Sequence, residues 1–304
     1  MRVTWNGKTE GERIVALGAF DGVHRGHRQL LETGIAWGRE RGIPLRACTF
    51  DRHPLEVIRP ETAPKLLTTL PEKIGCMAEI GVDELRIIPF PREKAGQEPE
   101  EFLRELREEC HLRAVIAGWN YTFGSRGRGD AELLKEDGRR HGYEVLIVPP
   151  VKTESDLTVS STEIRKALES GDAALAAELL GRPWSLCGLA GESAHPEDAP
   201  DFPAAGIKVS RKKLLPASGV YACLAEYGGK GTQAIAYVGN RASDGETAPL
   251  EIRPLEGRPP EPGEKTRIRL VDLLRQESPA RTPREREEQL EADRKEARFL
   301  FGMA

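Results

Sequence analysis

Cysteine is scarce in this sequence and carries no recognisable spacing. The five cysteines are odd in number and widely scattered, and no CxxC pair occurs among them. Such a distribution argues against a disulfide framework and against a CxxC-type site. We expect reduced, mostly buried thiols at Cys48, Cys76, Cys110, Cys187 and Cys223.

The sequence also lacks an excess of positive charge and long apolar runs. Lys and Arg number 45 against 49 Asp and Glu, a formal net charge of -4. This balance gives no basic footprint for a phosphate backbone, so we expect no nucleic-acid partner. Residues 1–13 are polar and lack the apolar core of a signal peptide, and no later stretch approaches a membrane-spanning length. We expect a cytoplasmic protein without a membrane partner; its oligomeric state is unknown.

What the sequence does contain is enough material for two globular domains. Its 304 residues, 38% hydrophobic and 31% charged, exceed the usual size of a single core. From residue 14 to residue 148, short apolar runs alternate with segments of helical spacing. That alternation predicts an α/β fold with a doubly wound parallel sheet. A further helix is expected to begin near Thr162 and to end just before Gly171, and we expect the first domain to cover residues 1–184.

After residue 184 the texture changes to short strand-like runs separated by Gly- and Pro-rich spacers. This texture predicts a small, largely antiparallel β domain over residues 185–304. Helical spacing returns near the end of the chain and predicts a closing helix. We expect its apolar residues to pack inward, namely Leu290, Ala297, Phe299, Leu300 and Phe301.

The most informative segment is GAFDGVHRGHRQLL, where the first strand should hand over to the first helix. The glycines Gly18, Gly22 and Gly26 would let the backbone approach a bulky ligand closely. The free amides of a helix start favour a phosphate. His24 and His27, three residues apart, could each donate a hydrogen bond to phosphoryl oxygens as charge develops. An ATP triphosphate would fit this arrangement.

Each element of this interpretation has a simpler alternative. Paired histidines on a helix are often metal ligands or solvated side chains, and glycine-rich turns are common. A second segment, VSSTEIR, places hydroxyl groups, amides and Arg165 at another helix start, where polyphosphate could be held. Taken alone, that segment is better explained as a capping box of Ser160 and Glu163. Both segments in one doubly wound domain favour a nucleotide site.

GAFDGVHRGH resembles the nucleotide-binding motif of the bacterial FAD synthetases, the flavin-adenylating branch of the HxGH nucleotidyltransferases. VSSTEIR is similar to the family's second signature. Further similar pieces follow in the family's order: TFDRHP (49–54), LLTTLPEK (66–73), IPFPRE (88–93), AGWNYTFGSRGRGD (117–130) and LLGRPW (179–184). The resemblance therefore covers the whole first domain. One departure is Arg52, where the family usually has proline.

The resemblance implies roles for individual residues. His24 and His27 would bind and polarise the ATP phosphates, with Arg165 closing over the triphosphate. Asn120 would face the flavin, whereas Tyr121 and Phe123 could equally be packing residues. Asp21 could instead cap the turn. The implied ATP-binding residues are Gly18, Phe20, Asp21, Gly22, Gly26, Ser160, Ser161 and Thr162.

The implied reaction is the transfer of AMP from ATP to flavin mononucleotide (FMN). The FMN phosphate would attack the α-phosphorus of ATP and expel pyrophosphate, leaving FAD as product. This chemistry needs alignment and charge neutralisation but no enzyme nucleophile. Mg²⁺ is expected with ATP, and the sequence contains no pattern of a dedicated protein metal site. The expected partners are therefore the small molecules ATP and FMN.

The second domain resembles the family's riboflavin kinase, a small β barrel with a terminal helix. GVYA (219–222), LEI (250–252), DLLR (272–275) and DRKEAR (293–298) occur in the family's order. Where the family has a threonine and an asparagine that hold magnesium and nucleotide, this chain has Ala204 and Gly206. Glu251 matches the proposed general base, but Arg253 replaces a histidine. We therefore expect a degenerate kinase site at Ala204, Gly206 and Glu251.

Four functions remain to be compared. The first is a monofunctional FMN adenylyltransferase. The second is a bifunctional enzyme that also phosphorylates riboflavin. A nucleotidyltransferase for another phosphorylated molecule would not explain AGWNYTFG or the barrel-like tail. A flavin-binding pseudoenzyme is the fourth, and the intact His24, His27 and Arg165 argue against it.

Overall fold

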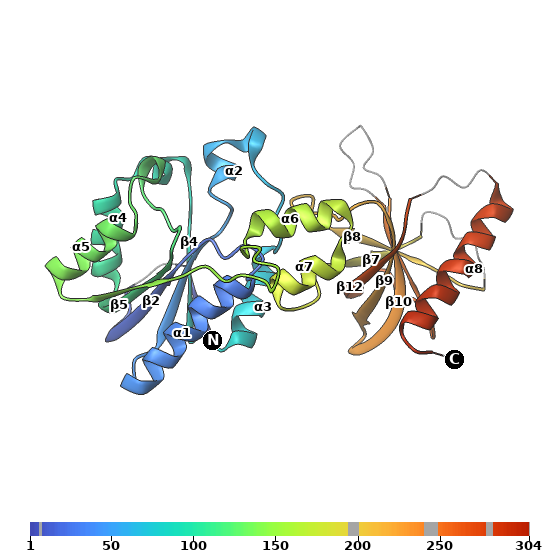
Figure 1. Ribbon diagram of the computed structural model, residues 1–304, viewed down its shortest axis with the longest axis horizontal. Helices are drawn as coiled ribbons and strands as arrows, with labels where there is room; N and C mark the ends of the chain where they lie inside the picture. The colour runs from blue at the N-terminus through green and yellow to red at the C-terminus, as the bar shows by residue number, and fades with distance from the viewer. Residues whose placement is uncertain (6–7, 194–200, 240–248, 278–281, 304) are drawn as a thin grey trace. The chain divides into compact units, whose positions relative to one another are not determined.

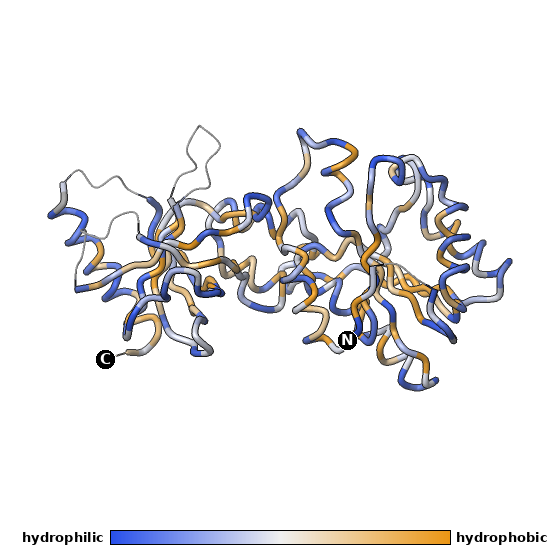
Figure 2. The backbone as a smooth tube through the Cα atoms, turned by 180° about the vertical axis from the view of Figure 1, so that it is seen from behind, coloured by the Kyte–Doolittle hydropathy of each residue, from blue (hydrophilic) through white to orange (hydrophobic). Residues whose placement is uncertain are grey.

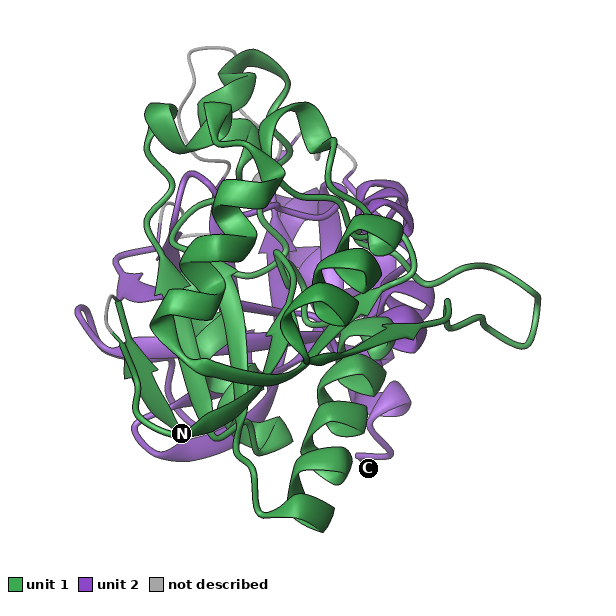
Figure 3. Cartoon of the chain, turned by 90° about the vertical axis from the view of Figure 1, so that its left-hand side faces the viewer, with its two compact units in different colours: residues 1–161 green, residues 162–304 purple. Residues whose placement is uncertain are grey.

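The computed structural model describes residues 1–5, 8–193, 201–239, 249–277 and 282–303. Contacts group the chain into two compact units, residues 1–161 and 162–304 (Figure 3). The short helical segment that follows residue 161 groups with the second unit. The domain boundary expected at residue 184 stays a prediction.

The first unit is built on a six-stranded sheet in which every pairing is parallel. The strand order is β1-β4-β3-β2-β5-β6, and Figure 1 labels β5, β2 and β4 of this sheet. The strands are β1 (Arg2–Thr4), β2 (Glu12–Leu17), β3 (Leu45–Phe50), β4 (Glu84–Ile88), β5 (His111–Gly118) and β6 (Glu144–Val148). The helices are α1 (Arg25–Arg41), α2 (Leu55–Ile58), α3 (Leu70–Ile80), α4 (Pro99–Glu109) and α5 (Ala131–His141). The expected doubly wound parallel sheet is confirmed.

Both faces of the sheet are covered because successive strand residues point to opposite sides. Ile14 and Ala16 of β2 share one core cluster with residues of α1 and α3. Val15 and Leu17 share the other with residues of α4 and α5. Figure 2 shows the apolar character of these strands as orange stretches. Strands buried on both faces read as continuous apolar runs, which is why the sequence revealed them.

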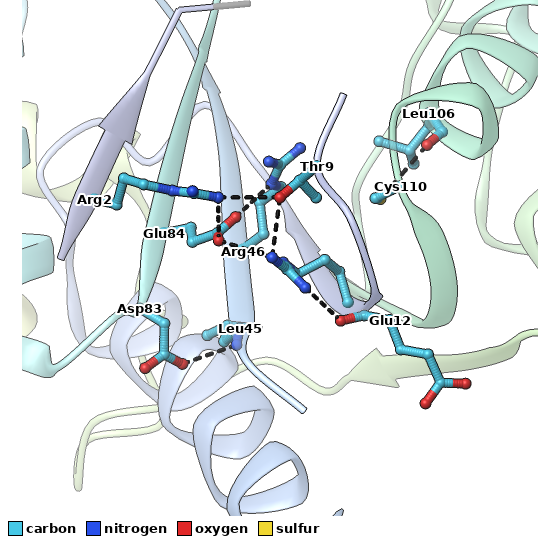
Figure 4. Close-up of polar contacts among 10 residues, drawn as sticks. Arg2, Thr9, Glu12, Leu45, Arg46, Asp83, Glu84, Leu106 and Cys110 are labelled. Atoms are coloured by element: carbon cyan, nitrogen blue, oxygen red, sulfur yellow. Dashed lines mark hydrogen bonds and ion pairs between the residues drawn. The ribbon is translucent and has the colours of Figure 1, made fainter. Parts of the chain in front are cut away.

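An ionic cluster fixes the amino-terminal ends of the strands. Glu84 accepts hydrogen bonds from Arg2 at 2.6 Å, Arg13 at 3.1 Å and Arg46 at 3.0 Å (Figure 4). Burial raises the pKa of Glu84, but Arg13 and Arg46 outweigh it and bring that pKa below its ordinary value. Arg86 of β4 forms an ion pair with Glu109, the last residue of α4. This edge of the sheet is closed by protein charges, and the opposite, carboxyl edge carries the sequence motifs.

The second unit contains a closed antiparallel barrel of order β10-β11-β8-β7-β12-β9. Its elements are α6 (Ser161–Ser170), α7 (Ala173–Leu180), β7 (Ser185–Gly191), β8 (Ala205–Val209), β9 (Gly219–Tyr227), β10 (Lys230–Val238), β11 (Leu250–Pro254), β12 (Lys265–Gln276) and α8 (Pro283–Leu300). The Ala217 amide donates to Leu168 of α6, and Gly171 lies against Leu273 of β12. The expected β domain and closing helix are confirmed.

The inward packing expected for α8 is correct only in part. Ala297 is fully buried, and Leu290 and Phe301 pack against the same core cluster. Phe299 is 87% exposed and Leu300 38% exposed, so the expectation was wrong for these two. They lie in the last turn of the helix, where a run of apolar residues cannot all face one side.

Two further features concern the cysteines and the helices. None of the five cysteines forms a disulfide, and Cys48, Cys110 and Cys223 are buried. Burial raises the pKa of Cys48 to about 12, so this thiol is unreactive. None of the helices in the described part of the chain is long and apolar enough to cross a membrane.

Candidate active site

The candidate site lies where the sheet reverses its winding direction. From β2 the chain proceeds to β3 on one side, and from β5 it proceeds to β6 on the other. β2 and β5 are neighbours, and their pairing extends as far as Leu17 and Ala117. In open α/β sheets the crevice outside the carboxyl ends at such a switch point is the usual ligand site. The segments that leave β2 and β5 are the two sequence motifs, GAFDGVHRGH and AGWNYTFG.

The turn after β2 has a strained backbone. Phe20 has φ 51° and Val23 has φ 42°, and Gly22 between them has φ 84°. Positive φ is costly for residues other than glycine, above all for a β-branched valine. The Val23 amide closes the turn on the Phe20 carbonyl at 3.3 Å. Such strain persists only where surrounding groups fix the conformation.

Hydrogen bonds to Asp21 help to hold this turn in its strained conformation. The Asp21 carboxylate, 4% exposed, accepts the backbone N–H groups of Leu67 and Thr68 at 3.0 Å. The Thr68 hydroxyl in turn accepts the Gly22 amide at 2.9 Å. These bonds favour the turn-capping role considered for Asp21 from the sequence. Contact between Asp21 and ATP stays a prediction.

His24 and His27 lie together at the start of α1. His24 is the N-cap residue, and its Nδ1 accepts the His27 backbone N–H at 3.3 Å. Because Nδ1 is an acceptor there, the proton of a neutral His24 ring belongs on Nε2. The two rings stack with centroids 3.6 Å apart, and the Phe20 ring meets His27 edge-on at 5.2 Å. The helix start, with its partial positive charge, therefore carries two ordered imidazoles.

Gly18 and Gly26 give room to aromatic rings of the protein itself. A Cβ atom at Gly18 would lie 2.9 Å from the Phe20 ring, and one at Gly26 would lie 3.3 Å from the His24 ring. Phe20 is fully buried, so its side chain belongs to the core. Contacts of these residues with ATP remain predictions, and their observed effect is to set the rings of the turn.

The second signature reaches the same turn through one hydroxyl. The Ser161 Oγ donates to the Asp21 carbonyl at 2.8 Å. α6 begins at Ser161 and ends at Ser170, as the sequence predicts. Ser160 is half-buried just before it. Thr162 and Arg165 lie on α6 in the second unit, so their part in binding phosphates stays a prediction.

The segment after β5 presents Trp119 and Asn120 to solvent. Trp119 is 53% exposed, and Asn120 is also exposed. Tyr121 and Phe123 stack on each other at 5.8 Å, and Phe123 contacts Phe102 of α4 at 5.5 Å. Tyr121 and Phe123 are therefore packing residues, as considered from the sequence. The flavin-facing role of Asn120 stays a prediction, and the exposed Trp119 beside it is a residue that sequence reasoning passed over.

Lys73 is the other residue that sequence reasoning missed, although it lies within the quoted segment LLTTLPEK. It is 8% exposed, and its Nζ donates to the Ala19 carbonyl at 2.7 Å and to the Thr49 hydroxyl at 3.1 Å. Burial lowers the pKa of Lys73 to about 8, and the charge of Asp21 opposes that shift. A lysine spaced as a helix residue looks like a solvated side chain, so nothing in the sequence alone distinguished it.

The expected degenerate kinase site can be described in part, since residues 194–200 lie outside the described chain. Glu251, 6% exposed, accepts a hydrogen bond from Ser193 at 2.9 Å. Gly206 pairs with Glu251 across β8 and β11, and a Cβ atom at Gly206 would lie 2.4 Å from the Glu192 carbonyl oxygen. Arg253 is buried and donates to the Phe202 carbonyl. Ala204 is half-buried and has no side-chain oxygen to serve as a ligand.

The described ranges contain no cluster of side chains that could enclose a metal ion. No group of three or more His, Cys, Asp or Glu residues there is placed to hold an ion. At the turn, the Asp21 carboxylate is engaged by the backbone amides of Leu67 and Thr68, and the imidazoles of His24 and His27 suit phosphate oxygens more than a hard cation.

Comparisons with known proteins agree with this arrangement. Residues 7–163 match the family model of FAD synthetase, and residues 180–301 match that of riboflavin kinase. The bifunctional riboflavin kinase/FMN adenylyltransferase of Escherichia coli K12 is 32% identical over 294 residues, which is 95% of this chain and 93% of that protein. The protein of the same description from Bacillus subtilis is 29% identical, over 96% of this chain and 93% of its own length.

A solved structure extends the likeness to the fold of almost the whole chain. It is described as a macrolide-efflux protein from Streptococcus pneumoniae, with a TM-score of 0.86 and 28% identity. The match covers 98% of this chain and 99% of that one. Both units therefore have a counterpart of known structure.

Proposed function

The chain belongs to the FAD synthetase family, and on that premise we propose that it is an FMN adenylyltransferase that transfers AMP from ATP to FMN. The observation that carries the proposal is the stacked pair His24 and His27 at the N-terminus of α1, beside the switch point of the sheet. An oxygen of the FMN phosphate attacks the α-phosphorus of ATP. The bond from that phosphorus to the bridging oxygen breaks, and pyrophosphate leaves.

The residues of the turn act on charge and position. His24, with Nδ1 engaged by the helix backbone, donates from Nε2 to a phosphate oxygen. His27 is held by His24 and Phe20 and stabilises the negative charge that develops on the transferring group. Ser160, Ser161, Thr162 and Arg165 complete the phosphate contacts in this proposal. Arg165 suits the β- and γ-phosphates because its guanidinium is a planar fork of donors.

The flavin side of the proposal uses the segment after β5. Asn120 holds the flavin ring by hydrogen bonds, and the exposed indole of Trp119 offers it a flat apolar surface. Mg²⁺ enters with ATP, where it neutralises phosphate charge. Cysteines without disulfides, three of them buried, fit a reducing compartment, which supports our expectation of the cytoplasm.

The second unit retains a kinase fold, and we propose that it has lost riboflavin kinase activity. The support is local: Ala204 and Gly206 supply no side-chain oxygen or amide as a ligand, and Gly206 leaves no space for a side chain. The bifunctional alternative is supported by the match to riboflavin kinase over residues 180–301 and by the buried Glu251.

The direct test of adenylyl transfer is a product assay. Purified full-length protein with FMN and Mg-ATP should form FAD and pyrophosphate in equal amounts, separated by chromatography. ATP consumption without FAD would contradict the proposal. FMN binding without turnover would identify a flavin-binding pseudoenzyme instead.

A further inference from the structure

Underneath the strained turn lies a buried ammonium group that the proposed reaction does not yet use. Lys73 of α3 reaches the Ala19 carbonyl at 2.7 Å, immediately before Phe20. It also reaches the hydroxyl of Thr49 on β3 at 3.1 Å. That hydroxyl itself donates to the Ala19 carbonyl at 2.9 Å. One carbonyl oxygen of the turn is thus held from both α3 and β3.

The charge of Lys73 is not required to satisfy these neighbours. Thr49 already supplies the Ala19 carbonyl with a hydrogen bond. A buried charged group without a close ion pair is costly to the folded state, and burial lowers the pKa of Lys73 accordingly. The Nζ of Lys73 donates hydrogen bonds to a carbonyl and to a hydroxyl, both neutral. An apolar side chain of similar length would avoid this cost.

Buried ionisable groups and strained backbone are both more frequent at functional sites than elsewhere in proteins. Lys73 donates a hydrogen bond to the carbonyl of Ala19. The next residue, Phe20, is the first residue of the turn with positive φ. Asp21 fixes the same turn from residues 67 and 68. The turn leads directly to His24, so a shift of Ala19 moves the imidazole pair.

We propose that Lys73 is a positioning residue for adenylyl transfer, which holds the Ala19 carbonyl so that the turn presents His24 and His27 to the phosphates of ATP. This inference rests on the proposed function. Lys73 acts through the turn, and displacement of reacting groups by about 1 Å can lower rates on the order of a hundredfold.

The test compares Lys73→Met with wild type and with Lys135→Met, an exposed lysine of α5. At pH 7, kcat/KM for ATP should fall about 10- to 100-fold in Lys73→Met, while KM for FMN stays within about twofold. The urea midpoint should be equal to or higher than that of wild type, because the buried charge is gone. Lys135→Met should match wild type.

A second variant tests whether Lys73 acts on activity through the Ala19 carbonyl. Thr49→Val removes the other group on the Ala19 carbonyl and keeps the charge. It should lower the same kinetic constant about threefold or more, and the double variant should lose less than the product of the single losses.

Three outcomes decide the matter. Wild-type kinetics in Lys73→Met would overturn the inference. A loss of activity accompanied by a urea midpoint below that of wild type would also overturn it, because Lys73 would then give the fold structural support alone. Absence of FAD formation by wild type would instead remove the proposed function itself, and so the two failures are distinguishable.

Discussion

The imidazole rings of His24 and His27 stack at an angle of 18° with centroids 3.6 Å apart, while the His24 Nδ1 accepts the His27 amide. One residue is thus both helix cap and stacking partner of the other. The pair forms a single rigid unit at the helix start, and its two members differ in what they do for the fold.

His27 carries no capping role, so its removal should affect chemistry most. His27→Ala should lower kcat for FAD formation on the order of a hundredfold or more, as loss of one preorganised donor does. His141→Ala, at the end of α5, is the matched control and should behave as wild type. FAD formation at the wild-type rate in His27→Ala would remove this residue from the site.

His24 allows capping and catalysis to be separated. Asparagine is a good N-cap residue and alanine a poor one. His24→Ala should lose activity and about 1 kcal/mol of stability. His24→Asn should lose as much activity and keep the stability of wild type. Chemical denaturation of both variants, measured beside FAD formation, checks this. Retained activity in His24→Asn would mean that His24 serves only as the cap.

The sequence predicted the sheet because its strands are apolar on both faces, as in Ile14 to Leu17. β1 was missed because an edge strand of three residues, Arg2–Thr4, shows no such run. Phe299 and Leu300 were misplaced because helical spacing alone does not fix which apolar side chain is left outside.

The placement of His24 and His27 together at a helix start was predictable from residue type and position in a motif, and their contact with ATP stays a prediction. The strain at Phe20 and Val23 was not predictable, because neither is a residue type expected at positive φ. The bonds from Asp21 to Leu67 and Thr68, and from Lys73 to Ala19, join segments more than forty residues apart. Such pairings appear only when the chain is folded.

Trp119 should contact a planar ring of the substrates. In Trp119→Ala, KM for FMN should rise about tenfold, since stacking on an aromatic side chain contributes on the order of 1 kcal/mol or more. FMN should quench the fluorescence of wild type more than that of Trp119→Phe. Trp5→Phe is the control, because Trp5 is 52% exposed but lies after β1, away from β2 and β5 in the strand order. Unchanged kinetics would exclude Trp119, and a raised KM for ATP instead would assign it to adenine.

Lys73 predicts a pH dependence of stability. Burial lowers its pKa from 10.5 to about 8, so between these values the unfolded chain binds a proton that the folded chain has released. Stability of wild type relative to Lys73→Met should therefore rise from pH 8 toward pH 10.5, by up to about 3 kcal/mol. Below pH 8 the difference should be flat. Urea midpoints of the two proteins across this range provide the measurement, and a flat difference throughout would contradict the burial of a charged Lys73.

The last prediction concerns the barrel, which we expect not to convert riboflavin to FMN at a useful rate. A kinase must place magnesium and the γ-phosphate against the ribityl hydroxyl, and the developing charge needs contacts there. Ala204 and Gly206 offer no side-chain oxygen or amide for such contacts. Nor should Gly206→Asn restore them, because a Cβ atom at that position would lie 2.4 Å from the Glu192 carbonyl oxygen, a backbone atom that cannot rotate away.

The barrel test uses two parallel reactions of the same purified protein. Riboflavin with Mg-ATP should yield neither FMN nor FAD, whereas FMN with Mg-ATP should yield FAD and pyrophosphate. The second reaction shows that the protein is folded and its nucleotide turn competent, so a blank first reaction is assigned to the barrel. Glu251 is the residue on which the opposite result would depend, since it is buried against Ser193 where the family has its proposed base. FMN formed from riboflavin by wild type, and abolished by Glu251→Gln, would establish a working kinase with other ligands and make the protein bifunctional.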